Sequence, residues 1–433
     1  MDSKLRNILL IGHQAREHAF VWRLALSNRV KRIYMMPGNP ALAGQPKILL
    51  LNRLNTTDLI AFCQKNTIDC VVVGTTAAME SGIVDACQAS NIPVIGANRQ
   101  SVQLEASKLF AKQFMQRHGI PTPTVRVVNT MHEFNQYQSI SFPCVLKAER
   151  VIKGCYSAIT VNNKREALEA GQKILRMQKD AYDGGCLLVE PFCSGRELSF
   201  TLMMDDNHWL ALPPCQDYKK LLDGNAGPNT GGMGSIAPVS WLTETQYQTI
   251  IQTIVEPTMQ AMLKEGLRYR GFLYLGIIFN ESGLPLLMEY NCRLGDPEGQ
   301  SLLMLMDSDL ADVTHHMATG KLFQLTINWR KGAAVSVYLV PQGYPNACLS
   351  RQVISLPETN FTDDTQQCFV GTLQSGETDQ QENQWLTGNN RTCCISGYAD
   401  TIGNARNRAY QTVNEIRNES ECLFYREDIG LDL

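Results

Sequence analysis

The sequence contains 433 residues, and because one hydrophobic core rarely serves more than about 300 residues, we expect two to four domains. Hydrophobic residues make up 44%, charged residues 19%, and the formal net charge is -3, so the charge balance gives no indication of a nucleic-acid-binding surface. The first apolar run is too short for a secretory signal, and no segment approaches transmembrane length. We therefore expect a cytoplasmic protein with small-molecule partners, no nucleic acid and no membrane.

The fourteen cysteines do not indicate a disulfide framework. They are scattered, without CxxC spacing, and several lie in apolar runs, as Cys70 does before residues 71–73. Reduced, mostly buried thiols are expected. Cys393 and Cys394 fall in a strand-like segment, where a metal or redox role is a minor alternative.

Short apolar strands alternate with helical segments through the first hundred residues, which is typical of a parallel α/β sheet. The expected strands are Asn7–Ile11, Arg32–Met35, Asp69–Val73 and Ile92–Ile95, and the first helix is Ala15–Asn28. A helix follows directly after Gly12. Because helix N-termini favour anions, residues 12–18 form a candidate phosphate site, although most such turns serve only local geometry.

A second α/β region is expected after a helix that runs from about residue 101 to His118 and ends at Gly119. Its expected elements are strands Pro143–Lys147, Ile159–Val161, Leu187–Val189 and Glu197–Met203, a polar, glycine-rich loop Gln216–Pro238, a helix Thr243–Glu265, and a hairpin of Leu273–Asn280 with Pro285–Glu289. The remainder opens with a strand at Ala333–Val340, is expected to be rich in loops over Asp363–Asn390, and ends with a helix near Ala405–Asn418.

The segment 227–234 carries the strongest local signal. It reads Gly-Pro-Asn-Thr-Gly-Gly-Met-Gly, and its four glycines can bring backbone N–H groups close to a charged ligand. A surface loop without a ligand is the alternative.

The segment 288–298 carries the second signal and reads Met-Glu-Tyr-Asn-Cys-Arg-Leu-Gly-Asp-Pro-Glu. On a strand, Glu289 and Asn291 point to the same face. Two hard oxygen ligands suit a Mg²⁺ that bridges nucleotide phosphates, and Arg293 can bind carboxylate or phosphate. The alternative is a solvated hairpin face.

Together, these two segments resemble the phosphoribosylamine–glycine ligase family, which belongs to the ATP-grasp ligases. The resemblance spans nearly the whole chain through Arg16-Glu17-His18, Pro37-Gly38-Asn39, Glu105-x-Ser107-Lys108, Gln216-Asp217, Ser308-Asp309-Leu310, Gly343-Tyr344-Pro345, Gly371-Thr372 and residues 426–430. It implies an α/β fold with a Rossmann-like, parallel-sheet preATP-grasp domain over residues 1–104, an ATP-grasp domain of two α+β lobes over 105–327, and a small mixed α/β C-terminal domain over 328–433.

The resemblance also implies the reaction and its residues. A monomer would join glycine to phosphoribosylamine with ATP and Mg²⁺ or Mn²⁺ as cofactors. The implied catalytic residues are Arg293, Asp217 and Lys153. The implied ATP contacts are Lys108, Lys147, Glu190, Phe192 and Glu197, and the implied metal ligands are Glu289 and Asn291. The implied substrate contacts are Gly12, Arg16, Glu17, His18, Asn229, Gly231, Gly232 and Gly295.

Three segments depart from the family pattern. Gln14-Ala15 replaces glycines, and a side chain there could obstruct a phosphate. Residues 75–80 replace Gly-Pro-Glu-Ala-Pro-Leu and lose its Glu. A lid is expected over about 149–157, but the family's glycine-rich sequence is absent. Lys153 could substitute for the family Lys from two positions earlier, whereas Val151-Ile152 should stiffen the lid.

These departures leave three hypotheses. The first is an active ligase with an unusual lid. The second is a non-catalytic paralogue that binds nucleotide. The third is an ATP-grasp ligase with a changed amine or acid.

Overall fold

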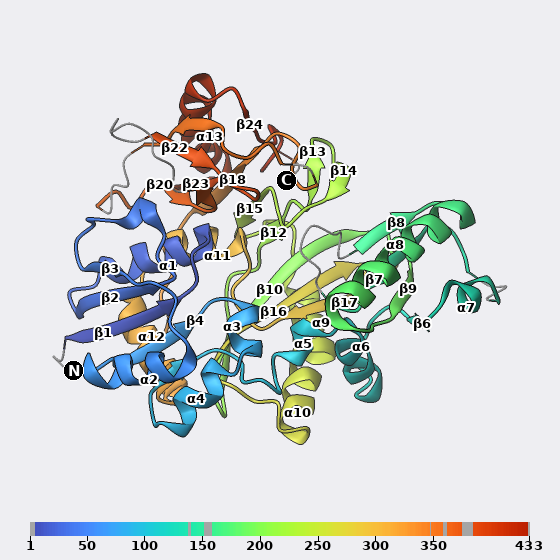
Figure 1. Ribbon diagram of the computed structural model, residues 1–433, viewed down its shortest axis with the longest axis horizontal. Helices are drawn as coiled ribbons and strands as arrows, with labels where there is room; N and C mark the ends of the chain where they lie inside the picture. Colours follow the sequence, from blue (N-terminus) through green and yellow to red (C-terminus); the bar gives the residue numbers. More distant parts are fainter. Residues whose placement is uncertain are drawn as a thin grey trace.

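The structure is a computed structural model that describes residues 5–136, 140–150, 158–346, 348–357, 362–374 and 384–431. The predicted α/β fold is confirmed. Figure 1 shows the N-terminal sheet at the left, the C-terminal part at the top, and the two lobes of the middle part at the right. Within the described ranges, no helix is both long and apolar enough to cross a membrane.

The N-terminal sheet is entirely parallel, with strand order β3-β2-β1-β4-β5. Its elements are β1 (Arg6–Ile11), α1 (Ala15–Ala25), β2 (Val30–Met36), the 3-10 turn η1 (Pro40–Leu42), β3 (Ile48–Leu50), α2 (Thr56–Lys65), β4 (Cys70–Val73), α3 (Thr76–Glu80), α4 (Ile83–Ala89) and β5 (Val94–Ile95). Two later helices, α11 (Glu298–Leu305) and α12 (Leu310–Ala318), pack against α1, and α12 also contacts β4 and β5. Coverage by these helices explains why β4 is buried throughout and is uniformly apolar.

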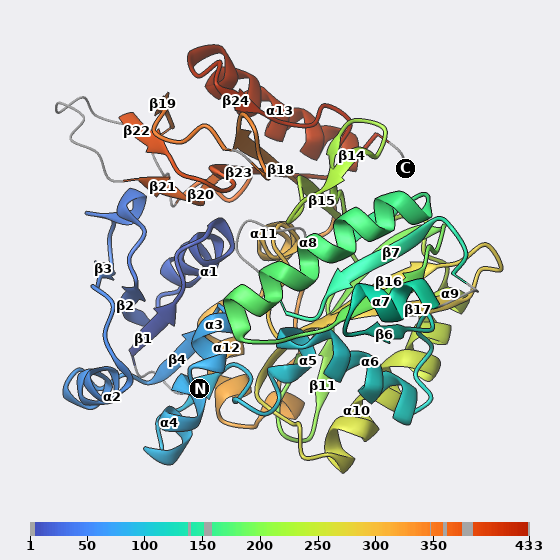
Figure 2. The same cartoon turned by 45° about the vertical axis from the view of Figure 1, so that its right-hand side comes forward.

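The smaller lobe of the middle part is an antiparallel sheet of order β6-β9-β7-β8. Its elements are β6 (Arg126–Val128), α7 (Met131–Gln136), β7 (Cys144–Ala148), β8 (Ala158–Val161), α8 (Lys164–Tyr182) and β9 (Leu187–Pro191). Figure 2 shows α8 lying along this sheet. The buried residues of α8 are Ala167, Gly171, Ile174 and Gln178, a spacing that places them on one face.

The larger lobe is a sheet of order β11-β10-β16-β17 and confirms the predicted hairpin. Its strands are β10 (Arg196–Met204), β11 (Trp209–Ala211), β16 (Gly271–Phe279) and β17 (Pro285–Asn291), and the helices α5 (Gln103–Ala106) and α6 (Lys108–Arg117) precede both lobes. The predicted helix Thr243–Glu265 is divided into α9 (Glu244–Ile250), a π-helical turn η2 (Ile251–Val255) and α10 (Glu256–Lys264). Pro257 cannot donate a helical hydrogen bond, which accounts for the wider turn before it.

The C-terminal sheet combines strands from two distant parts of the chain, in the order β12-β15-β18-β23-β20. Its strands are β12 (Gln216–Asp217), β15 (Gly234–Ala237), β18 (Ala333–Pro341), β20 (Gln366–Val370) and β23 (Cys393–Ala399), and β24 (Leu423–Phe424) pairs with β18. Helix α13 (Ile402–Glu419) packs on β18 and β23. The remaining elements are η3 (Leu322–Gln324), β19 (Val353–Ser355), β21 (Leu373–Gln374) and β22 (Gln384–Thr387).

This sheet corrects two predictions. The segment 216–238 is not simply a loop, because it holds β12, β15 and a small hairpin of β13 (Lys220–Leu222) and β14 (Ala226–Asn229). The stretch 363–390 likewise contains β20, whose last four residues are buried. Strands β15 and β20 pair with β18 and β23, which lie in other segments of the sequence, so local polarity could not reveal them. The domain boundary at 327–328 stays a prediction, since this sheet crosses it.

The outer edge of β20 is covered by two side chains from the N-terminal part. Val370 donates its backbone N–H to Nδ1 of His18 over 2.9 Å, and its carbonyl accepts a hydrogen bond from Nδ2 of Asn39 over 2.9 Å. His18 is fully buried and also packs edge-on against Phe369. These contacts satisfy an otherwise exposed strand edge and connect α1 to the C-terminal sheet.

His18 should make stability depend on pH. Burial lowers its pKa to about 3. An unfolded histidine has a pKa of about 6.5, so below that pH the unfolded chain binds a proton that the folded chain does not, and stability falls towards pH 3.

We expect the native protein to lose about 2 kcal/mol more of its free energy of unfolding between pH 7 and pH 5 than His18→Asn does, since Asn can accept the bond but does not titrate. Urea unfolding at both pH values measures the difference. Equal losses in the two proteins would contradict this assignment.

Candidate active site

Three lysines lie near one carboxylate between the two lobes. Nζ of Lys219 is 3.1 Å from Glu197 and 3.9 Å from Glu289. Burial raises the pKa of Glu289, but the charges of Lys219, Lys108 and Lys147 outweigh it, so the pKa is lowered overall. Burial also lowers the pKa of Lys108. These clustered lysines favour an anionic ligand.

Glu289 and Asn291 share one face of β17, opposite Gly276 and Tyr274 on β16. The register shifts between Gly276 and Ile277, so Leu287 and Tyr290 both reach the core while Glu289 and Asn291 remain on the open side. No cluster of three or more His, Cys, Asp or Glu side chains suitable for a metal occurs among the described residues. One carboxylate and one amide oxygen nevertheless fit Mg²⁺ that takes its other ligands from phosphates and water.

Glu190, at the end of β9, is held by two lysines. Its Oε2 atom lies 2.9 Å from Nζ of Lys147 and 3.1 Å from Nζ of Lys112. Phe192 is the first residue after β9 and is 46% exposed, and Glu197 is the second residue of β10. The residues expected at the adenine and ribose are therefore on β7 (Lys147), on β9 (Glu190), just after β9 (Phe192) and on β10 (Glu197).

Glu105 anchors Arg293. Its carboxylate is 3.0 Å from Nη2 of Arg293 and accepts hydrogen bonds from the backbone N–H of Cys292 over 2.8 Å and from the hydroxyl of Thr76 over 2.8 Å. Arg293 also donates to Oδ1 of Asn291 over 3.2 Å. Although burial lowers the pKa of Arg293, Glu105 and other carboxylates raise it overall. The guanidinium is thus fixed beside the predicted metal ligands.

The glycine-rich segment is held by an arginine from the C-terminal part. Arg391 donates through Nη1 to the carbonyls of Gly231 and Gly232, over 2.6 and 3.0 Å, and through Nη2 to Oδ2 of Asp296 over 2.9 Å. Tyr344 accepts a hydrogen bond from the N–H of Gly231 over 3.2 Å. Gly232 has φ +104°, and an added Cβ would lie 2.5 Å from Pro297, so this position requires glycine.

Asp217 lies beside this segment with one buried oxygen, Oδ1, for which the described residues supply no hydrogen-bond partner. Burial and then the charge of Glu298 raise the pKa of Asp217 well above its usual value. Glu298 itself is buried and accepts a 2.7 Å hydrogen bond from Ser199. A cationic group next to Asp217 would relieve the cost of this unpaired oxygen.

The turn 12–18 is filled by its own side chains. Glu17 is 2% exposed and accepts the backbone N–H of Gln14 over 2.9 Å, and a Cβ on Gly12 would lie 2.4 Å from it. Arg16 donates to Glu17, to the carbonyl of Gly74 and to the carbonyl of Leu294, over 2.6, 2.6 and 3.2 Å. This N-terminal amide and this guanidinium are therefore already engaged with the protein.

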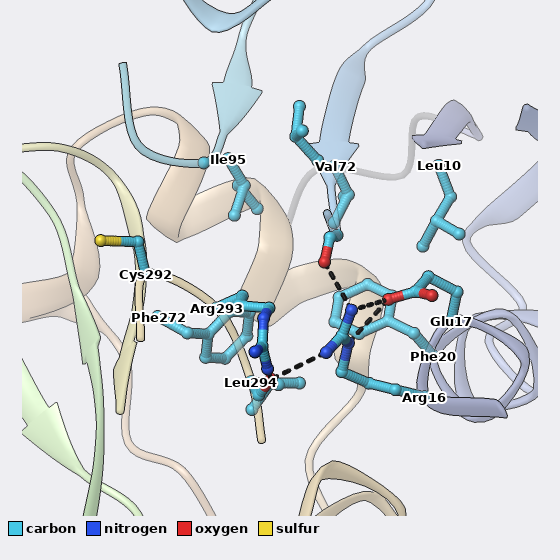
Figure 3. Close-up of a pocket in the computed structure, with 13 residues that line it drawn as sticks. Leu10, Arg16, Glu17, Phe20, Val72, Ile95, Phe272, Cys292, Arg293 and Leu294 are labelled. Carbon is cyan, nitrogen blue, oxygen red and sulfur yellow. Dashed lines mark hydrogen bonds and ion pairs between the residues drawn. The ribbon is translucent and has the colours of Figure 1, made fainter. Parts of the chain in front are cut away.

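Three predicted site residues, Arg16, Glu17 and Arg293, line one pocket with largely apolar walls. Figure 3 shows the guanidinium of Arg16 between Glu17 and Leu294, with Arg293 nearby. His18 is not among the lining residues, because its ring faces β20. Asn229, in β14, and Gly295, packed against Glu298, lie on the segments that carry the other predicted contacts. Lys153 lies outside the described residues.

Sequence reasoning missed Lys219 and Arg391 and gave Glu105 no role. Lys219 could have been found, because it lies two residues after Asp217, and side-chain alternation in an extended segment would place both on one face. Arg391 had no usable signal, since it lies far from Asp296 in sequence.

Comparison with known families accounts for nearly the whole chain. Residues 6–105 match the N domain of phosphoribosylglycinamide synthetase, residues 106–299 its ATP-grasp (A) domain and residues 334–432 its C domain. A phosphoribosylamine–glycine ligase of Neisseria meningitidis is 35% identical over 428 residues, which cover 98% of each chain. One from Vibrio cholerae is 35% identical over 430 residues, covering 98% of this chain and 97% of the relative.

Solved structures give the same result. The crystal structure of phosphoribosylamine–glycine ligase from Thermotoga maritima has a TM-score of 0.81 and 28% identity, with 98% of this chain and 100% of that chain covered. The biotin carboxylase domain of 2-oxoglutarate carboxylase from Hydrogenobacter thermophilus has a TM-score of 0.71 at 14% identity, over 98% of this chain and 92% of that one, and so shares the fold. The chain therefore belongs to the phosphoribosylamine–glycine ligase family of ATP-grasp enzymes.

Proposed function

We propose that the protein joins glycine to 5-phosphoribosylamine with ATP, giving glycinamide ribonucleotide, ADP and phosphate in purine biosynthesis. The proposal rests on the combination of two sites in one structure. Glu289 and Asn291 form an oxygen pair with lysines around it. Beside the glycine-rich segment, Asp217 has a buried oxygen without a hydrogen-bond partner among the described residues. We expect the enzyme to act in the cytoplasm as a monomer.

Asp217 would receive the ammonium group of glycine. Its Oδ1 has no partner among the described residues, and a bound ammonium would favour the charged carboxylate. Arg293, which Glu105 and Asn291 orient, would hold the glycine carboxylate and keep it directed towards the γ-phosphate. The amides of Gly231 and Gly232 and the side chain of Asn229 would complete the substrate-binding wall.

Lys108, Lys147 and Lys219 would neutralise the triphosphate while glycine's carboxylate oxygen attacks the γ-phosphorus and ADP leaves. Glu289 and Asn291 would hold Mg²⁺ or Mn²⁺, which supplies further charge neutralisation at the phosphates. The amine of phosphoribosylamine then attacks the glycyl carbonyl carbon and phosphate leaves, forming the amide and releasing a proton. The sugar of phosphoribosylamine would lie against the pocket lined by Arg16, Glu17 and Arg293, close to this carbonyl.

The first test is ADP release by the purified protein with ATP and Mg²⁺. We expect release only when glycine and freshly generated phosphoribosylamine are both present. Glu289→Gln should lower this rate about a hundredfold or more, because it removes a charge at the phosphates. Glu281→Gln makes the same change at the exposed turn of the β16–β17 hairpin and should keep full activity.

The other outcomes identify the rejected alternatives. ATP binding without ADP release would indicate the non-catalytic paralogue. Release that needs another acid or amine would indicate changed specificity.

A second prediction concerns Arg391. Lysine keeps its charge but cannot bond Gly231, Gly232 and Asp296 together, so Arg391→Lys should lower kcat/KM for glycine about tenfold or more while KM for ATP stays within about twofold. Steady-state kinetics with each substrate varied in turn measure this split. Arg408→Lys, an exposed change on α13, is the matched control. An unaltered kcat/KM for glycine would show that the loop keeps its shape without the arginine.

A further inference from the structure

Lys112 is the most deeply buried lysine near the nucleotide site, and the mechanism above does not use it. It is 2% exposed and lies one helical turn after Lys108 on α6. Burying an ammonium group costs desolvation free energy, which hydrogen bonds and ion pairs must offset. Its position therefore calls for a specific role.

Two partners hold Lys112. Its Nζ atom donates to the hydroxyl of Thr122 over 2.7 Å and lies 3.1 Å from Oε2 of Glu190. Thr122 in turn donates to the carbonyl of Leu287 over 2.7 Å. Lys112 thus connects α6 and β17 to the end of β9, and these elements come from both lobes.

The two oxygens of the Glu190 carboxylate have different surroundings. Both Lys112 and Lys147 bind Oε2, whereas Oε1 is buried and has no hydrogen-bond partner among the described residues. An unpaired buried carboxylate oxygen is costly, so its retention indicates an acceptor kept for a ligand that donates a hydrogen bond. A carboxylate oxygen that carries no proton can only accept a hydrogen bond, so Oε1 suits a donor group of the ligand.

We propose that Lys112 is a positioning residue that, with Thr122 and Lys147, fixes Glu190 so that Oε1 accepts a hydrogen bond from the 6-amino group of adenine. The site then selects 6-amino over 6-oxo purine triphosphates, because a 6-oxo group brings an acceptor against an acceptor. The inference rests on the proposed function only in taking this lobe as the nucleotide site.

The charge of Lys112 gives a second signature. Burial and the charge of Lys147 lower its pKa to about 8, while Glu190 and Cys193 raise it and Lys108 lies one turn away on the same helix. Anionic ATP would favour the protonated form. ATP affinity should therefore fall as pH rises through about 8, and this fall should be absent without Lys112.

The test is calorimetric binding of ATP and ITP, with Mg²⁺ but without glycine or the amine, to the native protein, Lys112→Met and Thr122→Val. ITP carries a 6-oxo group in place of the 6-amino group. We expect Lys112→Met to lower the preference for ATP about tenfold and to flatten the pH dependence of ATP affinity between pH 7 and 9. Thr122→Val should lower the preference in the same direction by a smaller factor. Lys173→Met, on the exposed face of α8, should change neither.

Equal weakening of ATP and ITP, or an unchanged preference with an unchanged pH profile, would overturn the inference. Thermal unfolding of each variant shows whether it folds, and the conservative Thr122 variant keeps the test open if Lys112→Met does not. Because binding is measured without turnover, a native protein that binds ATP selectively but releases no ADP would refute the proposed ligase activity and leave the role of Lys112 standing.

Discussion

The buried contact between Arg391 and Asp296 holds three distant parts of the chain together. Arg391 comes from the loop before β23, Asp296 from the segment after β17, and the carbonyls of Gly231 and Gly232 from the segment before β15. The guanidinium also lies over the ring of Tyr338, whose hydroxyl donates to Asp296 over 2.6 Å. A fully bonded buried ion pair of this kind fixes geometry more than it adds stability, and here it fixes the glycine-rich segment.

At the nucleotide site, several cations act on one carboxylate, Glu289. Burial raises the pKa of Glu289, but the charges of Lys219, Lys108 and Lys147 lower it overall. Lys147 and Lys219 already contact Glu190 and Glu197, and together with Lys108 they present positive charge to a bound triphosphate. The two regions therefore differ in role. The Arg391–Asp296 contact positions the glycine-rich segment, whereas the lysines near Glu289 can bind an anionic ligand.

The departures from the family pattern are accommodated by new contacts. Gln14, in place of a glycine, accepts a 3.0 Å hydrogen bond from the hydroxyl of Thr372 and so joins the N-terminal and C-terminal parts. Thr76 stands in the segment that has lost the family glutamate and donates to Glu105, the anchor of Arg293. Both changes direct side chains into the protein, which explains how the surrounding framework persists. The altered lid segment, 151–157, lies outside the described residues.

The sequence by itself determined the fold class, the β16–β17 hairpin, and the pairing of Glu289 with Asn291 on one face, because these depend on short-range periodicity and motif spacing. It also identified the glycine-rich segment and the family. Tertiary structure decided which charges meet. In the folded protein, His18 binds the backbone at the edge of β20, and Arg16 donates to carbonyls of two other segments. Arg391 contacts Gly231 and Asp296. These contacts join residues from 58 to 352 positions apart, and local sequence patterns do not reveal which of them meet.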